Sequence, residues 1–209
     1  TEEGRPLHLV RVGYPLPDSD EEIASGRNLL IMGTFHGNEP SGREMSLKLM
    51  RDLAYTEDPD MLELLEKSTI LFLPTVNPDG REANRRRNND NHDLNRDGVI
   101  LKTPEVQTLA KILKDFKPDI VLDAHERVSG PNISLLGSLN LNVDKDLQAL
   151  NQELIDDYMF PDLEDAGFTV DYYPPGGKPT TTRNIAGLRH SIGVLTEASW
   201  TDEPLVRVA

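Results

Sequence analysis

Short apolar runs that alternate with helix-like segments constrain the fold of this chain more than any other feature. Each run is short and is followed by turn-forming or polar residues, which is typical of a buried strand. The runs lie at residues 29–35, 69–76, 119–124, 132–136 and 193–196. We therefore predict at least five strands, most of them buried on both faces.

Two of the intervening segments have apolar residues at the spacing of an amphipathic helix. In residues 104–116, Thr103 suits the N-cap position and Pro104 the first helical position. Residues 144–160 repeat this periodicity. The alternation predicts an α/β fold, with a mostly parallel mixed sheet and helices on both faces. Ligands of such sheets gather outside the carboxyl ends of the strands, so the site is expected there.

Length and charge limit the domain count and the partners. The 209 residues show no repeat or linker, which predicts a single domain over residues 1–209. The net charge of −14 would repel nucleic acid and anionic membranes, and we expect neither as a partner. No apolar run is long enough to span a bilayer, and the first residues lack the layout of a signal peptide. Because cysteine is absent, any metal ligands must be His, Asp or Glu.

Three residues have the pattern of a metal site. His36 and Glu39 stand three apart, where the strand ending near Phe35 gives way to a helix beginning near Pro40. His125 closes another expected strand, within DIVLDAHE. Two imidazole nitrogens and one carboxylate, with a fourth position open, form a ligand set of catalytic zinc. The other three histidines lack ligand spacing, and we interpret them as structural or solvated.

The segment 77–98 supplies arginines in a chain that is otherwise acidic. It starts with the turn signal NPDG. A peptidase needs one cation for a developing oxyanion and another for a terminal carboxylate, and Arg86 and Arg96 suit these roles. Residues 93–98 also match half of a calcium loop, but Pro104 occupies the position of its bidentate Glu, so we reject that interpretation.

Glu197 ends the expected strand GVLTE. Beside a metal, a carboxylate at this position could act as the general base that takes a proton from water. Tyr172 and Tyr173 precede a Pro- and Gly-rich stretch that predicts an exposed loop.

The motifs HGNE, NPDG, DLNRD, DAHE and LTE occur in the order found in the zinc metallocarboxypeptidases, and on this basis the chain resembles that family in its bacterial branch. The resemblance covers nearly the whole chain. It implies a Zn²⁺ cofactor, a peptide substrate and hydrolysis of the C-terminal peptide bond by zinc-activated water. We favour a secreted or cell-envelope location over the cytoplasm and make no prediction of oligomeric state.

The resemblance also assigns roles to residues. It makes His36, Glu39 and His125 the zinc ligands and Glu197 the general base. Arg86, seven residues before Asp93, would polarise the scissile carbonyl. The resemblance also assigns Asn95 and Arg96 to binding the terminal carboxylate of the substrate, and Asp93 to orienting His36. Tyr173 stands four residues before Gly177, as in the mobile loop of the family, and would close over the bound substrate; Tyr172 is the alternative.

Three features depart from the family pattern. The chain ends twelve residues after Glu197, which predicts a truncated C-terminus. Thr182 falls at the base of the expected specificity pocket beside Arg183, and neither is a carboxylate, so we predict a preference for acidic or small polar C-terminal residues over Lys. Arg183 would bind an acidic side chain of the substrate if it points inward, and a side chain that faces solvent or braces the loop is equally open. The HGNE motif is shared with N-acyl amino acid deacylases. That activity remains an alternative, as does a catalytically silent binding module.

Overall fold

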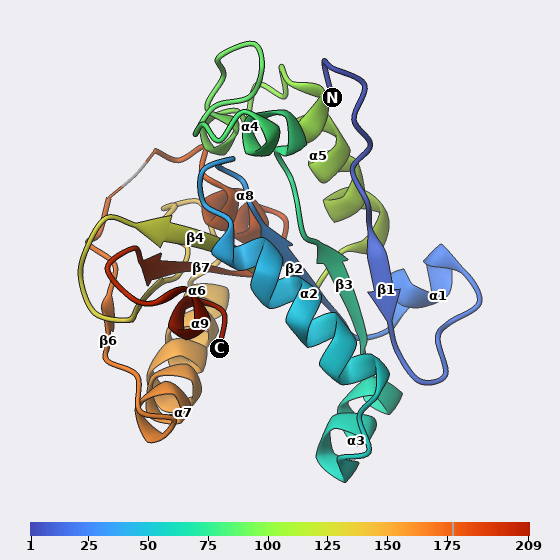
Figure 1. Ribbon diagram of the computed structural model, residues 1–209. Coiled ribbons are helices and arrows are strands. Elements are labelled where there is room, and N and C mark those ends of the chain that lie inside the picture. The colour runs from blue at the N-terminus through green and yellow to red at the C-terminus, as the bar shows by residue number, and fades with distance from the viewer. Residues whose placement is uncertain (177) are drawn as a thin grey trace.

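The computed structural model describes residues 1–176 and 178–209. Its strands form one twisted sheet through the middle of the molecule, in the order β1-β3-β2-β4-β7-β5-β6 (Figure 1). Across the sheet the strands are β1 (Val10–Val12), β3 (Thr69–Leu73), β2 (Asn28–Gly33), β4 (Ile120–Arg127), β7 (Ile192–Ser199), β5 (Ile133–Leu136) and β6 (Val170–Tyr172). Strands β3, β2, β4 and β7 are parallel, whereas β1 is antiparallel to β3 and β5 is antiparallel to β7. The prediction of a mostly parallel mixed sheet is confirmed.

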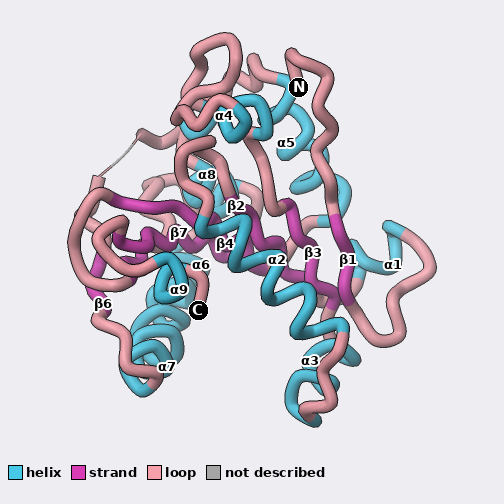
Figure 2. The backbone as a smooth tube through the Cα atoms, in the orientation of Figure 1, coloured by secondary structure: helices cyan, strands magenta, loops and turns pink. Residues whose placement is uncertain are grey.

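Helices cover both faces of this sheet, as Figure 2 shows. One face carries α1 (Asp20–Ser25), α5 (Pro104–Phe116) and α8 (Thr182–Leu188). The opposite face carries α2 (Ser41–Ala54), α3 (Pro59–Lys67), α6 (Lys145–Glu153), a π-helical turn (Leu154–Met159) and α7 (Phe160–Asp165). The short α4 (Pro78–Glu82), a 3₁₀ turn (Leu94–Arg96) and α9 (Pro204–Arg207) lie in loops. None of the helices in the described part of the chain combines the length and hydropathy needed to cross a membrane.

The alternation of side chains along the central strands explains the two layers. In β2, Leu30 and Met32 belong to the core under α5, whereas Ile31 belongs to the core under α2. Adjacent residues of a strand point to opposite faces, so a continuous apolar run is what a sheet covered on both faces requires. The predicted helix 104–116 is α5, with Thr103 at the N-cap position and Pro104 in the first turn.

The structure corrects several expected boundaries. Strand β4 continues past His125 to Arg127, and β7 continues past Glu197 to Ser199, so neither residue ends its strand. The helical segment predicted at 144–160 extends to Asp165 and contains the π-helical turn. The edge strands β1 and β6 have three residues each and are largely exposed, which is why they show no apolar run.

Candidate metal centre and active site

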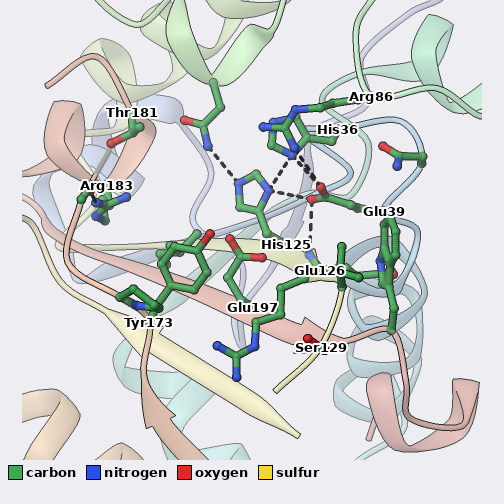
Figure 3. A pocket seen from close by; sticks show the side chains of 18 of the residues that line it. His36, Glu39, Arg86, His125, Glu126, Ser129, Tyr173, Thr181, Arg183 and Glu197 are labelled. Carbon is green, nitrogen blue, oxygen red and sulfur yellow. Dashed lines mark hydrogen bonds and ion pairs between the residues drawn. The ribbon is translucent and has the colours of Figure 1, made fainter. Parts of the chain in front are cut away.

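His36, Glu39 and His125 converge at the carboxyl ends of β2 and β4 (Figure 3). His36 Nδ1 lies 2.8 Å from Glu39 Oε1, and His125 Nδ1 lies 2.8 Å from Glu39 Oε2. The two Nδ1 atoms are 3.1 Å apart. All three residues are buried, and one ligand atom from each lies within 4.8 Å of the others. The cluster could therefore hold one metal ion through two nitrogens and a carboxylate, facing an open cavity.

Hydrogen bonds inside the cluster keep Glu39 ionised. Burial alone would raise the pKa of Glu39, but the bonds with His125 and His36 dominate and lower it to about 2. Burial alone would lower the pKa of His125, but Asp123 and Glu39 raise it well above its ordinary value. Glu39 thus supplies negative charge where a cation would sit, and together with Asp123 it favours the charged form of His125.

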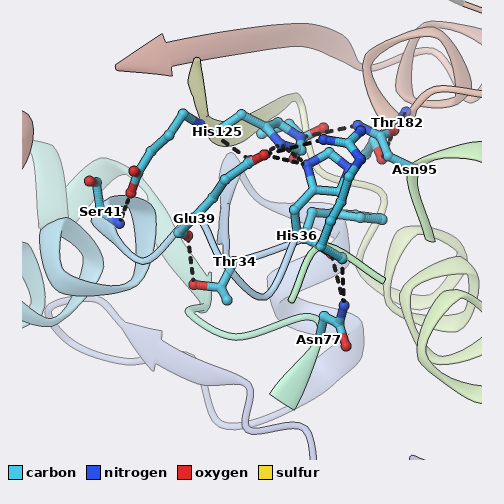
Figure 4. Close-up of polar contacts among 12 residues, drawn as sticks. Thr34, His36, Glu39, Ser41, Asn77, Asn95, His125 and Thr182 are labelled. Atoms are coloured by element: carbon cyan, nitrogen blue, oxygen red, sulfur yellow. Dashed lines mark hydrogen bonds and ion pairs between the residues drawn. The ribbon is translucent and has the colours of Figure 1, made fainter. Parts of the chain in front are cut away.

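One close approach of backbone and the side chain of Asn77 shape the turn that presents His36 and Glu39. A Cβ on Gly37 would lie 2.0 Å from the carbonyl carbon of Gly80, so the HGNE turn can pack this closely on the NPDG turn only because residue 37 is glycine. Asn77 holds its own turn by accepting a bond from the backbone N–H of Gly80 at 2.9 Å, and it donates to the carbonyl of Phe35 at 3.4 Å (Figure 4). The NPDG motif therefore braces the metal turn and does not line the cavity.

Carboxylates behind the cluster orient the two imidazoles. Asp93 Oδ1 lies 3.3 Å from His36 Nε2, and the predicted role of Asp93 in orienting His36 remains a prediction. Asp123 Oδ1 lies 3.0 Å from His125 Nε2. If Nδ1 binds a metal, Nε2 carries the proton, and Asp123 then stands beside it as an ion-pair partner, although its Oδ1 forms no hydrogen bond within the described residues. The side-chain amide nitrogen of Asn95 lies 3.1 Å from the same Nε2. Because this nitrogen can only donate, it cannot accept the Nε2 proton, and its own N–H groups must donate to another acceptor.

Glu197 lies directly beside His125, because the two residues are paired in the β4–β7 register. Burial raises the pKa of Glu197 to about 7, although the positive charge of His125 acts in the opposite direction. A carboxylate with a pKa near neutrality is suited to accept a proton from water and return it to a leaving group. Glu197 thus lies next to the cluster, and its role as general base remains a prediction.

A cavity of about 720 Å³ opens over the cluster and brings the other predicted residues together. Arg86 contacts Glu39 at 3.4 Å and Asp93 at 3.2 Å. Asn95 is fixed by Thr182, whose backbone N–H donates to Asn95 Oδ1 at 2.9 Å. The cavity is lined by the predicted residues His36, Glu39, Arg86, Asn95, Arg96, His125, Tyr173, Arg183 and Glu197.

The structure distinguishes the two tyrosine candidates. Tyr173 lines the cavity, and its backbone N–H donates to the carbonyl of Leu135 at 2.9 Å. Tyr172 is the last residue of β6 and packs edge-on against Phe160, with 4.8 Å between the ring centroids. Gly177, from which the resemblance counts back to Tyr173, lies outside the described residues.

Sequence reasoning missed several residues of this site, and Asp123, Arg127 and Trp200 are examples. Asp123 is two positions before His125 and Arg127 is two positions after it, so all three lie on the same face of β4. This alternation was the signal that could have identified Asp123 and Arg127. Trp200 also lines the cavity, but it follows the end of β7 and no local pattern marks it.

Comparisons with known proteins agree with this geometry. Residues 1–125 match the family model described as zinc carboxypeptidase. The chain is 32% identical over 210 residues to "Probable carboxypeptidase 2" of Trichophyton verrucosum and 30% identical over 208 residues to "Carboxypeptidase 2" of Trichophyton equinum. Both alignments cover 92% of this chain but only 40% and 38% of the relatives, so the chain spans about two fifths of their length.

Solved structures show the same fold. A metallo-carboxypeptidase from Burkholderia cenocepacia superposes with a TM-score of 0.78 at 21% identity, over 94% of this chain and 53% of that chain. Because the two Trichophyton relatives are fungal and the Burkholderia structure is bacterial, the comparisons indicate a family and not the bacterial branch expected from the motifs.

Proposed function

Since the chain belongs to the zinc carboxypeptidase family, we propose that it binds zinc through His36, Glu39 and His125 and hydrolyses the C-terminal peptide bond of a peptide. The observation that carries the proposal is the convergence of these three ligand atoms within 4.8 Å, next to Glu197 and under one cavity. Zinc in this site would act as a Lewis acid on the scissile carbonyl and lower the pKa of a water.

The side chains of the cavity supply the remaining steps. The Glu197 carboxylate takes a proton from the attacking water and returns it to the leaving amine. Arg86 donates hydrogen bonds to the oxygen that becomes negatively charged in the transition state. Asn95 and Arg96 bind the terminal carboxylate of the substrate, with Arg96 as its charge partner. Tyr173 closes over the bound residue.

Hydrolysis of blocked dipeptides, with and without a chelator, tests the proposal. We expect release of the C-terminal amino acid, loss of activity on chelation and recovery on adding zinc. If no peptide releases its C-terminal residue under these conditions, the peptidase assignment is wrong. Activity on N-acyl amino acids alone would favour the deacylase alternative, although family membership favours the peptidase. The silent binding module is disfavoured because the three ligands and Glu197 are all in place.

A further inference from the structure

Two arginines of the cavity lack an acidic partner. Arg86 pairs with Glu39, and Arg127 lies 3.5 Å from Asp171. By contrast, Arg96 and Arg183 form no ion pair with any carboxylate of residues 1–176 and 178–209. The cavity of this acidic protein therefore presents two guanidinium groups that no carboxylate of the described residues contacts as an ion pair.

Arg183 is the more unusual of the two because it is buried, with 5% of the residue exposed. Its Nε donates to the carbonyl of Gly137 at 3.1 Å, and its Nη2 donates to the carbonyl of Gly176 at 2.6 Å. No described residue accepts a hydrogen bond from Nη1. Burial lowers the pKa of Arg183, and the charges of Asp123, Tyr173 and Glu197 act against that effect.

The position of Arg183 defines where a second carboxylate would bind. In Figure 3, Arg183 lies with Tyr173 on one side of the cavity, while Glu39 lies on the other side and Glu197 lies between them. The charges of Arg96 and Arg183 are close enough to affect one another. A ligand with two nearby carboxylates would thus bring one to each guanidinium.

A buried guanidinium without a contacting counter-ion is costly, and the neutral carbonyls that accept from Arg183 do not cancel its charge. The planar fork of arginine matches a carboxylate through two parallel N–H bonds. If Arg96 binds the terminal carboxylate, the second carboxylate must come from the side chain of the departing residue. Only Asp and Glu carry one.

We propose that this site selects peptides whose C-terminal residue is Asp or Glu, and that Arg183 binds the side-chain carboxylate. The inference rests on the proposed function and names its substrate class. A C-terminal Lys would place its ammonium near Arg183, where two like charges repel.

The test compares blocked dipeptides that differ only in the last residue: Glu, its neutral isostere Gln, and Lys. We expect kcat/KM to be about 10- to 100-fold higher for Glu than for Gln, because a hydrogen bond to a charged group is lost in the Gln peptide. Lys should rank last. In Arg183→Gln, kcat/KM for the Glu and Gln peptides should differ by less than about threefold, because the interaction between Arg183 and the substrate carboxylate has been removed.

Asn184→Ala is the matched control. Asn184 braces the same loops without charge, because its Oδ1 accepts from the backbone N–H of Leu139 at 2.9 Å and its Nδ2 donates to the carbonyl of Lys178 at 3.2 Å. This variant should slow all peptides alike and keep the Glu over Gln ratio. If Arg183→Gln behaves in the same way, Arg183 only braces the loops and the inference is wrong. Faster cleavage of the Lys peptide by the unmodified chain would also overturn it.

A binding measurement separates this inference from the proposed function. In the Glu197→Gln variant, calorimetry with N-acetyl-L-glutamate and N-acetyl-L-glutamine reports selection without turnover. We expect tighter binding of the glutamate, lost when Arg183→Gln is added. If no peptide is ever cleaved but this preference is present, the peptidase proposal fails while the acidic site stands. Equal affinity for the two ligands would refute the acidic site whatever the catalytic result.

Discussion

Two opposing influences act on the pKa of the Glu197 carboxylate. Burial raises its pKa to about 7, while the neighbouring His125 favours the ionised form. The group is paired in register with a cluster residue but contributes no atom to the cluster. The role proposed for Glu197 is therefore proton transfer and not metal binding, and a substitution should separate the two.

Glu197→Gln should reduce kcat by about 10²- to 10⁴-fold while zinc content stays at the level of the unmodified protein, because an amide cannot accept the proton. Zinc is measured by metal analysis after dialysis, and kcat with a blocked dipeptide. A variant that keeps its full rate would remove Glu197 from the mechanism. Parallel loss of zinc would instead make it part of the metal site.

The pH dependence of kcat/KM should reflect the same group. Glu197 acts as a base only when ionised, so activity should be lost as pH falls through its pKa, which lies at about 7 without metal. Zinc favours the anion, and the midpoint of the zinc-loaded protein should therefore lie below this value. A rate profile from about pH 4 to pH 9 measures it, and the acidic limb should disappear from the residual activity of Glu197→Gln.

Without metal, the raised pKa of Glu197 makes the stability of the fold decrease as pH rises, whereas the activity increases with pH. An acid whose pKa is higher in the folded state contributes stability below its ordinary value of 4.5, and this contribution is lost as pH rises through about 7.

At the scale of the element, β4 is the strand that organises the site. Asp123, His125 and Arg127 project from one face of it, and the strand lies between β2 and β7 in the sheet. This position brings His125 next to the turn after β2 on one side and next to Glu197 on the other. Replacing the residue behind the ligand tests whether the strand also fixes the orientation of the imidazole.

Asp123→Asn should weaken zinc binding by about 10- to 100-fold, because it removes the carboxylate charge that lies 3.0 Å from Nε2 of the ligand His125. Competition with a chromogenic chelator measures the affinity. Asp115→Asn is the control, since Asp115 lies in the last turn of α5 and pairs only with Lys111 at the surface. Equal affinity in the two variants would mean that Asp123 does not support the ligand.

At the scale of the whole molecule, the charge is distributed unevenly. The chain carries a net charge of −14, yet its cavity is lined by four arginines. The residues of the metal cluster also connect β2, α2 and β4, and these elements contribute to the hydrophobic cores on both faces of the sheet. Occupancy of the site should therefore affect the stability of the entire fold.

Removing zinc should lower the thermal midpoint by roughly 10 °C. A ligand at about 1,000 times its Kd adds about 4 kcal/mol, and about 1 kcal/mol shifts Tm by about 2–4 °C in a domain of this size. Scanning calorimetry with chelator, and again after adding zinc, measures the shift. In His36→Ala and His125→Ala, which should bind less zinc, the midpoint should not respond to chelator. A response as large as that of the unmodified chain would contradict the ligand assignment.

Much of the fold and of the metal site was predictable because the signals are local. The strands β2, β3, β4, β5 and β7 have apolar runs, and α5 has its cap and proline. HGNE places His36 and Glu39 in one turn, and the strand-to-turn context indicates which edge of the sheet they occupy. Side-chain spacing within a turn or a strand is set by backbone geometry, so a linear pattern is sufficient to read it.

The tertiary structure decided what depends on contacts between distant segments. It paired Glu197 with His125, placed Asp123 behind that histidine, and brought Tyr173 and not Tyr172 to the cavity. It also buried Arg183 against the carbonyls of two loops, whereas the sequence was equally consistent with an Arg183 side chain that faces solvent. Burial and charge pairing are properties of packed neighbours, and packing brings together residues whose separation along the chain carries no information about their distance in space.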